Sequence, residues 1–141
     1  MNWSYLFFSF DGRIPRQTFW SAFLVILGIE IACRYVVNQF ADDQRLEAVV
    51  ALLFTYSEFA LFAKRGHDRN ISPRVIGVFF VLDVFLGFLI VVGLGGTREQ
   101  PGIFMLVVLL AWFAFAIVLL VELGLRRGTR GPNRYGPDPL V

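Results

Sequence analysis

Long apolar runs alternate with short polar segments along the whole chain, and each run is long enough to cross a lipid bilayer. A helix that rises 1.5 Å per residue needs about 20 apolar residues to cross roughly 30 Å of hydrocarbon. Runs of this kind cover 18–37, 46–63, 75–94 and 103–125. They predict an all-α, polytopic membrane protein built as a bundle of four transmembrane helices. The polar segments are too short for a separate soluble domain, so 1–141 is expected to form a single membrane domain.

Two terminal segments flank the apolar runs. Residues 1–17 begin with an apolar, aromatic stretch that is too short to span a membrane, and aromatic side chains favour the headgroup level. Residues 126–141 are rich in Gly and Pro, which prevent the last helix from continuing. We therefore expect an interfacial N-terminal segment and an irregular C-terminal tail.

Lys and Arg residues are distributed very unevenly between the polar segments. Of the 13 Lys and Arg residues, ten lie in the two termini and in the loop between the second and third runs. Only Arg45 and Arg98 lie in the other two loops, and Arg34 lies inside the first run. Short segments rich in Lys and Arg stay in the cytoplasm. The pattern thus predicts that the N- and C-termini are both cytoplasmic.

The composition agrees with a membrane protein and limits its chemistry. Hydrophobic residues make up 57% of the chain and charged residues 17%, with a mean hydropathy of +0.65, whereas about a quarter of the residues in soluble domains are charged. Cys33 is the only cysteine, so neither an intrachain disulfide nor a thiolate metal site can form. His67 is the only histidine, and a zinc site needs three or four ligands. We expect no metal, no cofactor and no nucleic-acid partner.

Three polar segments on the predicted cytoplasmic side carry motifs. The first contains Phe10, Gly12, Arg13, Arg16, Phe19 and Trp20; the second contains Arg65, His67, Asp68 and Ser72; the third contains Gly128, Thr129, Gly131, Asn133, Tyr135, Gly136, Asp138 and Pro139. Together, in this order between four spans, they resemble the domain of unknown function 805 (YhaH-like) family of bacterial inner-membrane proteins. The resemblance covers nearly the whole chain and implies a multi-pass protein of the bacterial inner (plasma) membrane with no assigned activity. The chain departs from the family pattern at Gly66, Pro73 and Arg74.

The motif residues on the cytoplasmic side form the first candidate site. Arg side chains chelate phosphate oxygens in a bidentate way, and a Gly-rich backbone can present successive N–H groups to an anion. The same Arg residues would also serve simply to fix the topology by lying at the interface. His67 next to Asp68 permits an enzymatic reading, which would need an oriented imidazole and a dry pocket. The structural alternative is that Asp68 or Asn70 caps a helix start or pairs with Arg65 or Arg69 to shape the loop. The candidate ligand-binding residues are Arg13, Arg16, Arg65, His67, Asp68, Arg130, Asn133 and Asp138.

Charged residues inside the spans form the second candidate set, because an ionised side chain at mid-bilayer costs at least about 2.5 kcal/mol. Glu30 and Arg34 are four residues apart, a spacing that favours a local ion pair, and Glu122 with Arg126 has the same spacing. Glu58 is expected near the cytoplasmic side, within reach of Arg65 or of an Arg in the N-terminal segment. Asp83 lies near the middle of its span among apolar residues and is the best candidate for a functional intramembrane group, unless it only bonds across the bundle to Tyr56, Ser57 or Arg34.

The sequence leaves three functional hypotheses. The leading one is a non-enzymatic integral inner-membrane protein whose cytoplasmic polar layer binds anionic phospholipid headgroups or a partner protein. The first alternative is a small oligomeric channel or transporter that uses Asp83, Glu30 and Glu58. The second is a lipid-modifying enzyme that uses His67 and Asp68. The expected partners are the lipid bilayer, anionic phospholipid, and a second copy or another membrane protein.

Overall fold

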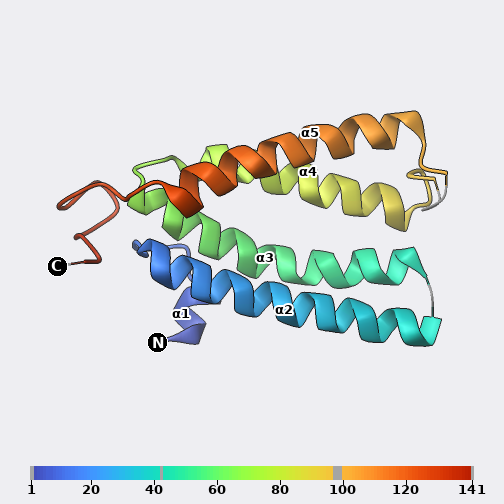
Figure 1. Cartoon of the computed structure of the whole chain (residues 1–141), viewed down its shortest axis with the longest axis horizontal. Coiled ribbons are helices and arrows are strands. Elements are labelled where there is room, and N and C mark those ends of the chain that lie inside the picture. Colours follow the sequence, from blue (N-terminus) through green and yellow to red (C-terminus); the bar gives the residue numbers. More distant parts are fainter. Residues whose placement is uncertain (1, 42, 97–99, 141) are drawn as a thin grey trace.

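The computed structural model describes residues 2–41, 43–96 and 100–140. In order along the chain it contains α1 (Trp3–Phe8), α2 (Arg16–Ala41), α3 (Gln44–Asp68), α4 (Pro73–Val91), α5 (Ile103–Leu119) and the π-helical segment η1 (Leu120–Leu125) that continues α5. The all-α prediction is confirmed, and four helices are long and apolar enough to cross a membrane, α5 with η1 being the fourth. They are the helices of a multi-pass membrane protein. Both chain ends lie at the same end of the bundle (Figure 1).

The helix boundaries follow from ordinary capping chemistry. The side chain of Asp43 accepts a hydrogen bond from the backbone N–H of Arg45 and starts α3. Ser72 does the same for α4, and Pro73 at the first helical position cannot donate and needs no partner there. Between α3 and α4, Asn70 adopts a positive φ of 57°, which reverses the chain after α3.

α3 is longer than the apolar run that predicted it. It continues past 63 to Asp68, so Arg65, His67 and Asp68 lie in its last turns and not in a loop. Residues Leu61 to Asp68 are all buried, because α1, α2, α4 and η1 pack around this end of the helix. The motif of the second polar segment is therefore a helix end held inside the protein.

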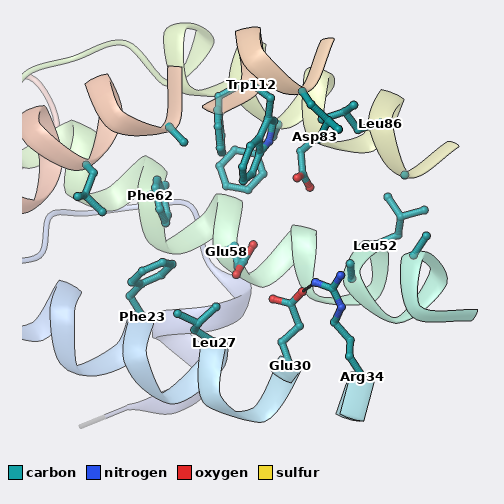
Figure 2. A pocket seen from close by; sticks show the side chains of 18 of the residues that line it. Phe23, Leu27, Glu30, Arg34, Leu52, Glu58, Phe62, Asp83, Leu86 and Trp112 are labelled. Carbon is teal, nitrogen blue, oxygen red and sulfur yellow. Dashed lines mark hydrogen bonds and ion pairs between the residues drawn. The ribbon is translucent and has the colours of Figure 1, made fainter. Parts of the chain in front are cut away.

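Packing is uneven along the bundle. An aromatic-rich core lies at the end that holds the termini and includes Phe19, Leu61, Phe62 and Ile76. A much smaller cluster of Leu86, Leu89 and Met105 joins α4 to α5 toward the other end. Between the pair α2 and α3 and the pair α4 and α5 lies a cavity of about 380 Å³ (Figure 2).

Candidate functional site at the basic end of the bundle

The three motif segments meet at one end of the bundle, which we call the basic end: residues 2–16, 64–74 and 120–140. The last turns of α3 carry the charges at its centre. Lys64 and Arg65 are 0% exposed, Asp68 is 3% exposed and Arg13 is 7% exposed. Buried charges are tolerated only when they are paired and hydrogen-bonded, so the partners of these four side chains decide what the basic end can do.

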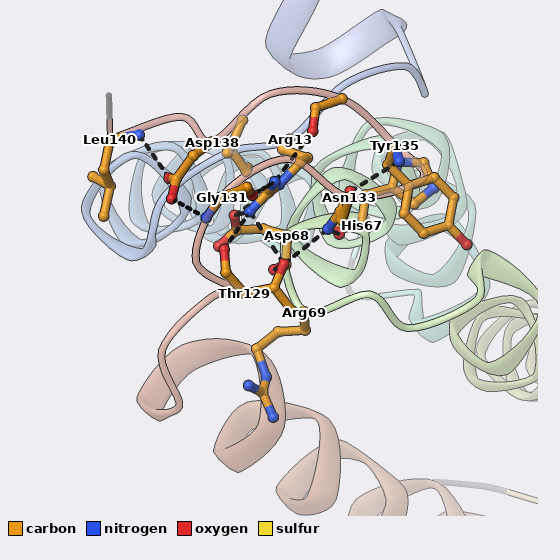
Figure 3. Close-up of polar contacts among 12 residues, drawn as sticks. Arg13, His67, Asp68, Arg69, Thr129, Gly131, Asn133, Tyr135, Asp138 and Leu140 are labelled. Atoms are coloured by element: carbon orange, nitrogen blue, oxygen red, sulfur yellow. Dashed lines mark hydrogen bonds and ion pairs between the residues drawn. The ribbon is translucent and has the colours of Figure 1, made fainter.

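Asp68 lies between two guanidinium groups. Arg13 donates to Asp68 Oδ1 through Nη2 at 2.9 Å and through Nε at 3.2 Å. Arg65 donates through Nη1 to the other carboxylate oxygen, Oδ2. The three side chains are at most 5% exposed. One carboxylate thus joins a residue of the N-terminal segment to a residue of its own helix in a buried ion triad, shown in part in Figure 3.

The remaining donors of Arg13 hold the C-terminal tail. Nη1 donates to the backbone oxygens of Gly131 at 2.8 Å and Gly136 at 3.2 Å, and Nη2 donates to that of Thr129 at 2.7 Å. The backbone N–H of Thr129 in turn donates to the Asp68 carbonyl at 2.7 Å. The tail therefore closes over Arg13 and α3 although it contains no regular helix.

Gly128 is the point of closest approach between the tail and α3. A Cβ atom built at this position would lie 2.0 Å from Asp68 Oδ2. Any side chain here would push the tail away from the carboxylate or break the ion triad. The Gly-Thr pair of the third motif is explained by this contact together with the Thr129 hydrogen bonds to Asp68.

Arg65 also caps the end of the last helix. Its Nε donates to Leu123 O at 2.6 Å and its Nη2 to Arg126 O at 2.6 Å. The last carbonyls of a helix have no partners within it. Here Trp20 Nε1 donates a hydrogen bond to Gly124 O at 3.0 Å, and Arg16 Nη1 donates one to Leu125 O at 2.8 Å. Side chains from the first and second motifs thus terminate η1.

Lys64 performs the same task for α1. Its Nζ donates to the backbone oxygens of Tyr5 and Leu6, both at 2.6 Å, and also to Ser9 O. It lies 4.9 Å from the centre of the Tyr5 ring, close enough for a cation–π contact. The buried ammonium group of Lys64 consequently holds α1 against α3.

His67 is fixed by packing and by one backbone contact. Its ring stacks on Tyr135 with 3.9 Å between ring centres, and Nδ1 lies 3.0 Å from Gly12 O. Asn133 Nδ2 donates to the backbone oxygen of His67 at 2.9 Å. The Ser72 hydroxyl accepts the N–H that starts α4. The pair that an enzyme would need, a base oriented by a carboxylate beside a nucleophile, is not assembled among these residues.

Asp138 orders the end of the tail. Its carboxylate accepts from the backbone N–H groups of Gly131 at 2.9 Å and Leu140 at 3.0 Å. These two hydrogen bonds lower the pKa of the Asp138 carboxyl below its ordinary value. Gly131 has a positive φ of 72°, which permits the turn that brings the two N–H groups together.

A cavity of about 280 Å³ opens beside the ion triad. It is lined by Pro15, Arg16, Arg65, Asp68, Arg127, Gly128, Thr129, Arg130, Asp138 and Leu140. Five of the predicted ligand-binding residues line it. The other three do not: Arg13 and His67 are covered by the tail, and Asn133 belongs to the tail and donates to His67 O. Arg16, Arg127 and Arg130 are exposed.

Sequence reasoning did not single out several residues that complete the basic end. They include Lys64 and Arg127. Glu122 was expected to pair with Arg126, but its second ion pair, with Arg69 at 3.2 Å, was not expected. Lys64 precedes the motif arginine, but nothing in the sequence distinguishes it from an interfacial lysine. The Arg69 pair joins α3 to η1 over 53 positions, a contact that only the folded chain reveals.

The charged residues inside the spans have mixed outcomes. Glu30 and Arg34 form the expected ion pair at 3.1 Å, and Arg126 pairs with Glu122 at 2.7 Å. Glu58 does not reach Arg65, which is occupied by Asp68 and backbone oxygens, and it faces the larger cavity instead. Asp83 accepts from the Thr55 hydroxyl at 3.1 Å. This crossing bond from α4 to α3 uses a different partner from the three that the sequence suggested.

Comparison with known proteins agrees with the motif reading. Residues 7–137 match the model of a family described as "Protein of unknown function (DUF805)". The chain is similar to the "Uncharacterized protein YiiR" of Escherichia coli strain K12 and to the protein of the same name in strain O157:H7. Each is 29% identical over 136 residues, which cover 93% of this chain and 86% of the relative. No solved structure matches.

Proposed function

Because this chain belongs to the DUF805 family, whose description assigns no activity, we propose its function from the site: a non-enzymatic inner-membrane protein whose basic end faces the cytoplasm and binds the phosphate of an anionic lipid headgroup. The cavity beside the ion triad is the binding site. The observation that carries this proposal is that more guanidinium groups than carboxylates line that cavity.

The charge balance favours an anion. Four of the lining residues are arginines and two are aspartates. Asp68 is already neutralised by Arg13 and Arg65, and Asp138 accepts two backbone hydrogen bonds. The guanidinium groups of Arg127 and Arg130 donate no hydrogen bond to any described residue, and both are exposed at the rim. They are available to chelate a phosphate, which arginine does in a bidentate way.

The position favours a lipid over a soluble anion. The cavity lies where η1 ends and α2 begins: Arg16 lines it and donates to Leu125 O, and the apolar part of both helices starts immediately beyond these residues. A headgroup phosphate at the membrane surface would stand at this level while its acyl chains lie along the helices. Basic residues near an anionic leaflet each contribute about 1 kcal/mol, and the excess of Lys and Arg at this end supports a cytoplasmic orientation.

The test compares lipid binding by the variant Arg127→Ala/Arg130→Ala with binding by Arg74→Ala. Arg74 is an exposed arginine of the same end that does not line the cavity. Loss of two contacts of about 1 kcal/mol each predicts roughly 30-fold weaker binding of phosphatidylglycerol, measured by native mass spectrometry. Phosphatidylcholine and inorganic phosphate serve as the neutral-lipid and free-anion arms. Equal phosphatidylglycerol binding by both variants would refute the proposal.

A further inference from the structure

The larger cavity lies in the middle of the bundle and shares no lining residue with the cavity at the basic end. It is about 380 Å³ in volume, within the range of small-molecule pockets. Its wall is mainly apolar and aromatic, with Phe23, Leu27, Phe62, Leu86 and Trp112 among the lining residues, and all four long helices contribute (Figure 2). A pocket of this size inside the apolar spans would be expected to carry only apolar groups if it merely accommodated acyl chains.

Three acidic side chains reach this cavity from three different helices. Glu30 of α2, Glu58 of α3 and Asp83 of α4 line it together with one cation, Arg34. Arg34 is already paired with Glu30 at 3.1 Å, and Figure 2 shows the carboxyl group of Glu58 close to that pair. The cavity is therefore lined by three acidic side chains and by a single basic one.

A second polar feature lies on the opposite wall. The indole nitrogen of Trp112 is buried and directed toward the carboxyl group of Asp83. Figure 2 shows the Trp112 ring extending into the cavity next to Asp83, whose carboxylate is bonded to Thr55. An aromatic face beside a carboxylate is the arrangement that proteins use for organic cations.

A metal ion fits this cavity poorly. Among the residues that the structure describes, no group of three or more His, Cys, Asp or Glu side chains is close enough to hold a metal ion. The acidic groups are spread over the walls of a pocket large enough for an organic molecule. An apolar body would contact the aromatic wall while its positive charge lay between Glu58 and Asp83.

We propose that this cavity binds a lipophilic organic cation within the membrane, a site separate from the phosphate site at the basic end. The carboxyl groups of Glu58 and Asp83 lie next to the positive charge of the ligand, and the face of the Trp112 ring contacts the bound molecule. Such a site would explain why acidic residues that take no part in the phosphate site lie inside the apolar spans.

The experiment measures equilibrium binding of tetraphenylphosphonium and the smaller benzyltriethylammonium to the protein in nanodiscs, with empty nanodiscs subtracted. Tetraphenylborate, which has the shape of the first probe and the opposite charge, is the matched control ligand. We expect saturable binding of at least one cation and none of the borate. The variant Glu58→Gln/Asp83→Asn should bind the cation at least about tenfold more weakly, the loss expected from one charge-assisted contact.

The control variant is Glu122→Gln, because Glu122 is an acid of the same chain that lies at the basic end and outside this cavity. A second route uses Ala116→Phe, which places a bulky ring in the cavity while all charges remain. It should abolish binding even if the charge variant folds poorly. Failure of both cations to saturate, equal binding of the borate, or unchanged cation binding in both cavity variants would overturn the proposal. Phosphatidylglycerol binding at the basic end should be unaffected by either cavity variant.

Discussion

Removing the charge of Asp68 is the most informative perturbation of the basic end. Asp68→Asn keeps the shape of the side chain but leaves the guanidinium groups of Arg13 and Arg65 without their shared counter-ion. Both side chains are at most 1% exposed. Breaking a buried pair by removing one partner costs about 3–5 kcal/mol. Two cations depend on this one carboxylate, so we expect a loss toward the upper part of that range.

The loss should be largest where the tail meets α3. Arg13 holds three tail carbonyls, and its position depends on Asp68. Hydrogen exchange of the tail amides, read together with the unfolding transition in detergent, would measure both effects. Asp11→Asn is the control, because Asp11 is an exposed acid of the same end. If the two variants lose the same stability and tail protection, the ion triad does not organise the basic end.

Further variants test single contacts. Gly128→Ala should release the tail, because its Cβ would lie 2.0 Å from Asp68 Oδ2; faster hydrogen exchange at Thr129 would show it, and unchanged exchange would contradict it. Lys64→Met should free α1 from α3, which limited proteolysis near residue 9 would detect. The Asp138 carboxylate stabilises the tail at pH values above its ordinary pKa of 3.8, and this contribution should disappear as the pH falls through its lowered folded-state pKa; in Asp138→Asn this step in tail exchange should be absent. A reporter fused to the C-terminus that is active only in the cytoplasm should be active, and activity of a periplasm-only reporter would contradict the proposed orientation.

The transmembrane helices could be predicted because their signal is local. A run of about 20 apolar residues is a property of one segment, and caps such as Ser72 with Pro73 sit next to the element that they start. The meeting of three motif segments at one end also followed from an even number of spans. The charge pattern alone could not say what these residues do when they meet.

The roles of the motif residues depend on contacts across the chain. Arg13 and Asp68 are 55 positions apart, and Arg13 and Gly136 are 123 positions apart. The sequence suggested that the arginines of the motifs face a ligand. In the structure, the guanidinium groups of Arg13 and Arg65 instead donate their hydrogen bonds to Asp68 and to backbone oxygens. The ends of α1 and η1 required such donors, and no local residue supplied them. In the proposed lipid site, Arg127 and Arg130 at the rim are therefore the residues expected to contact the phosphate.

Solid-state NMR of the protein in bilayers that contain phosphatidylglycerol would test the lipid site most directly. With 15N-labelled arginine, dephasing of guanidinium signals by 31P reports which side chains lie against a lipid phosphate. We predict dephasing for Arg127 and Arg130 and none for the buried Arg13 and Arg65. Dephasing of Arg74 to the same extent as Arg127 and Arg130, or no dephasing of either rim arginine, would contradict a phosphate site at the basic end.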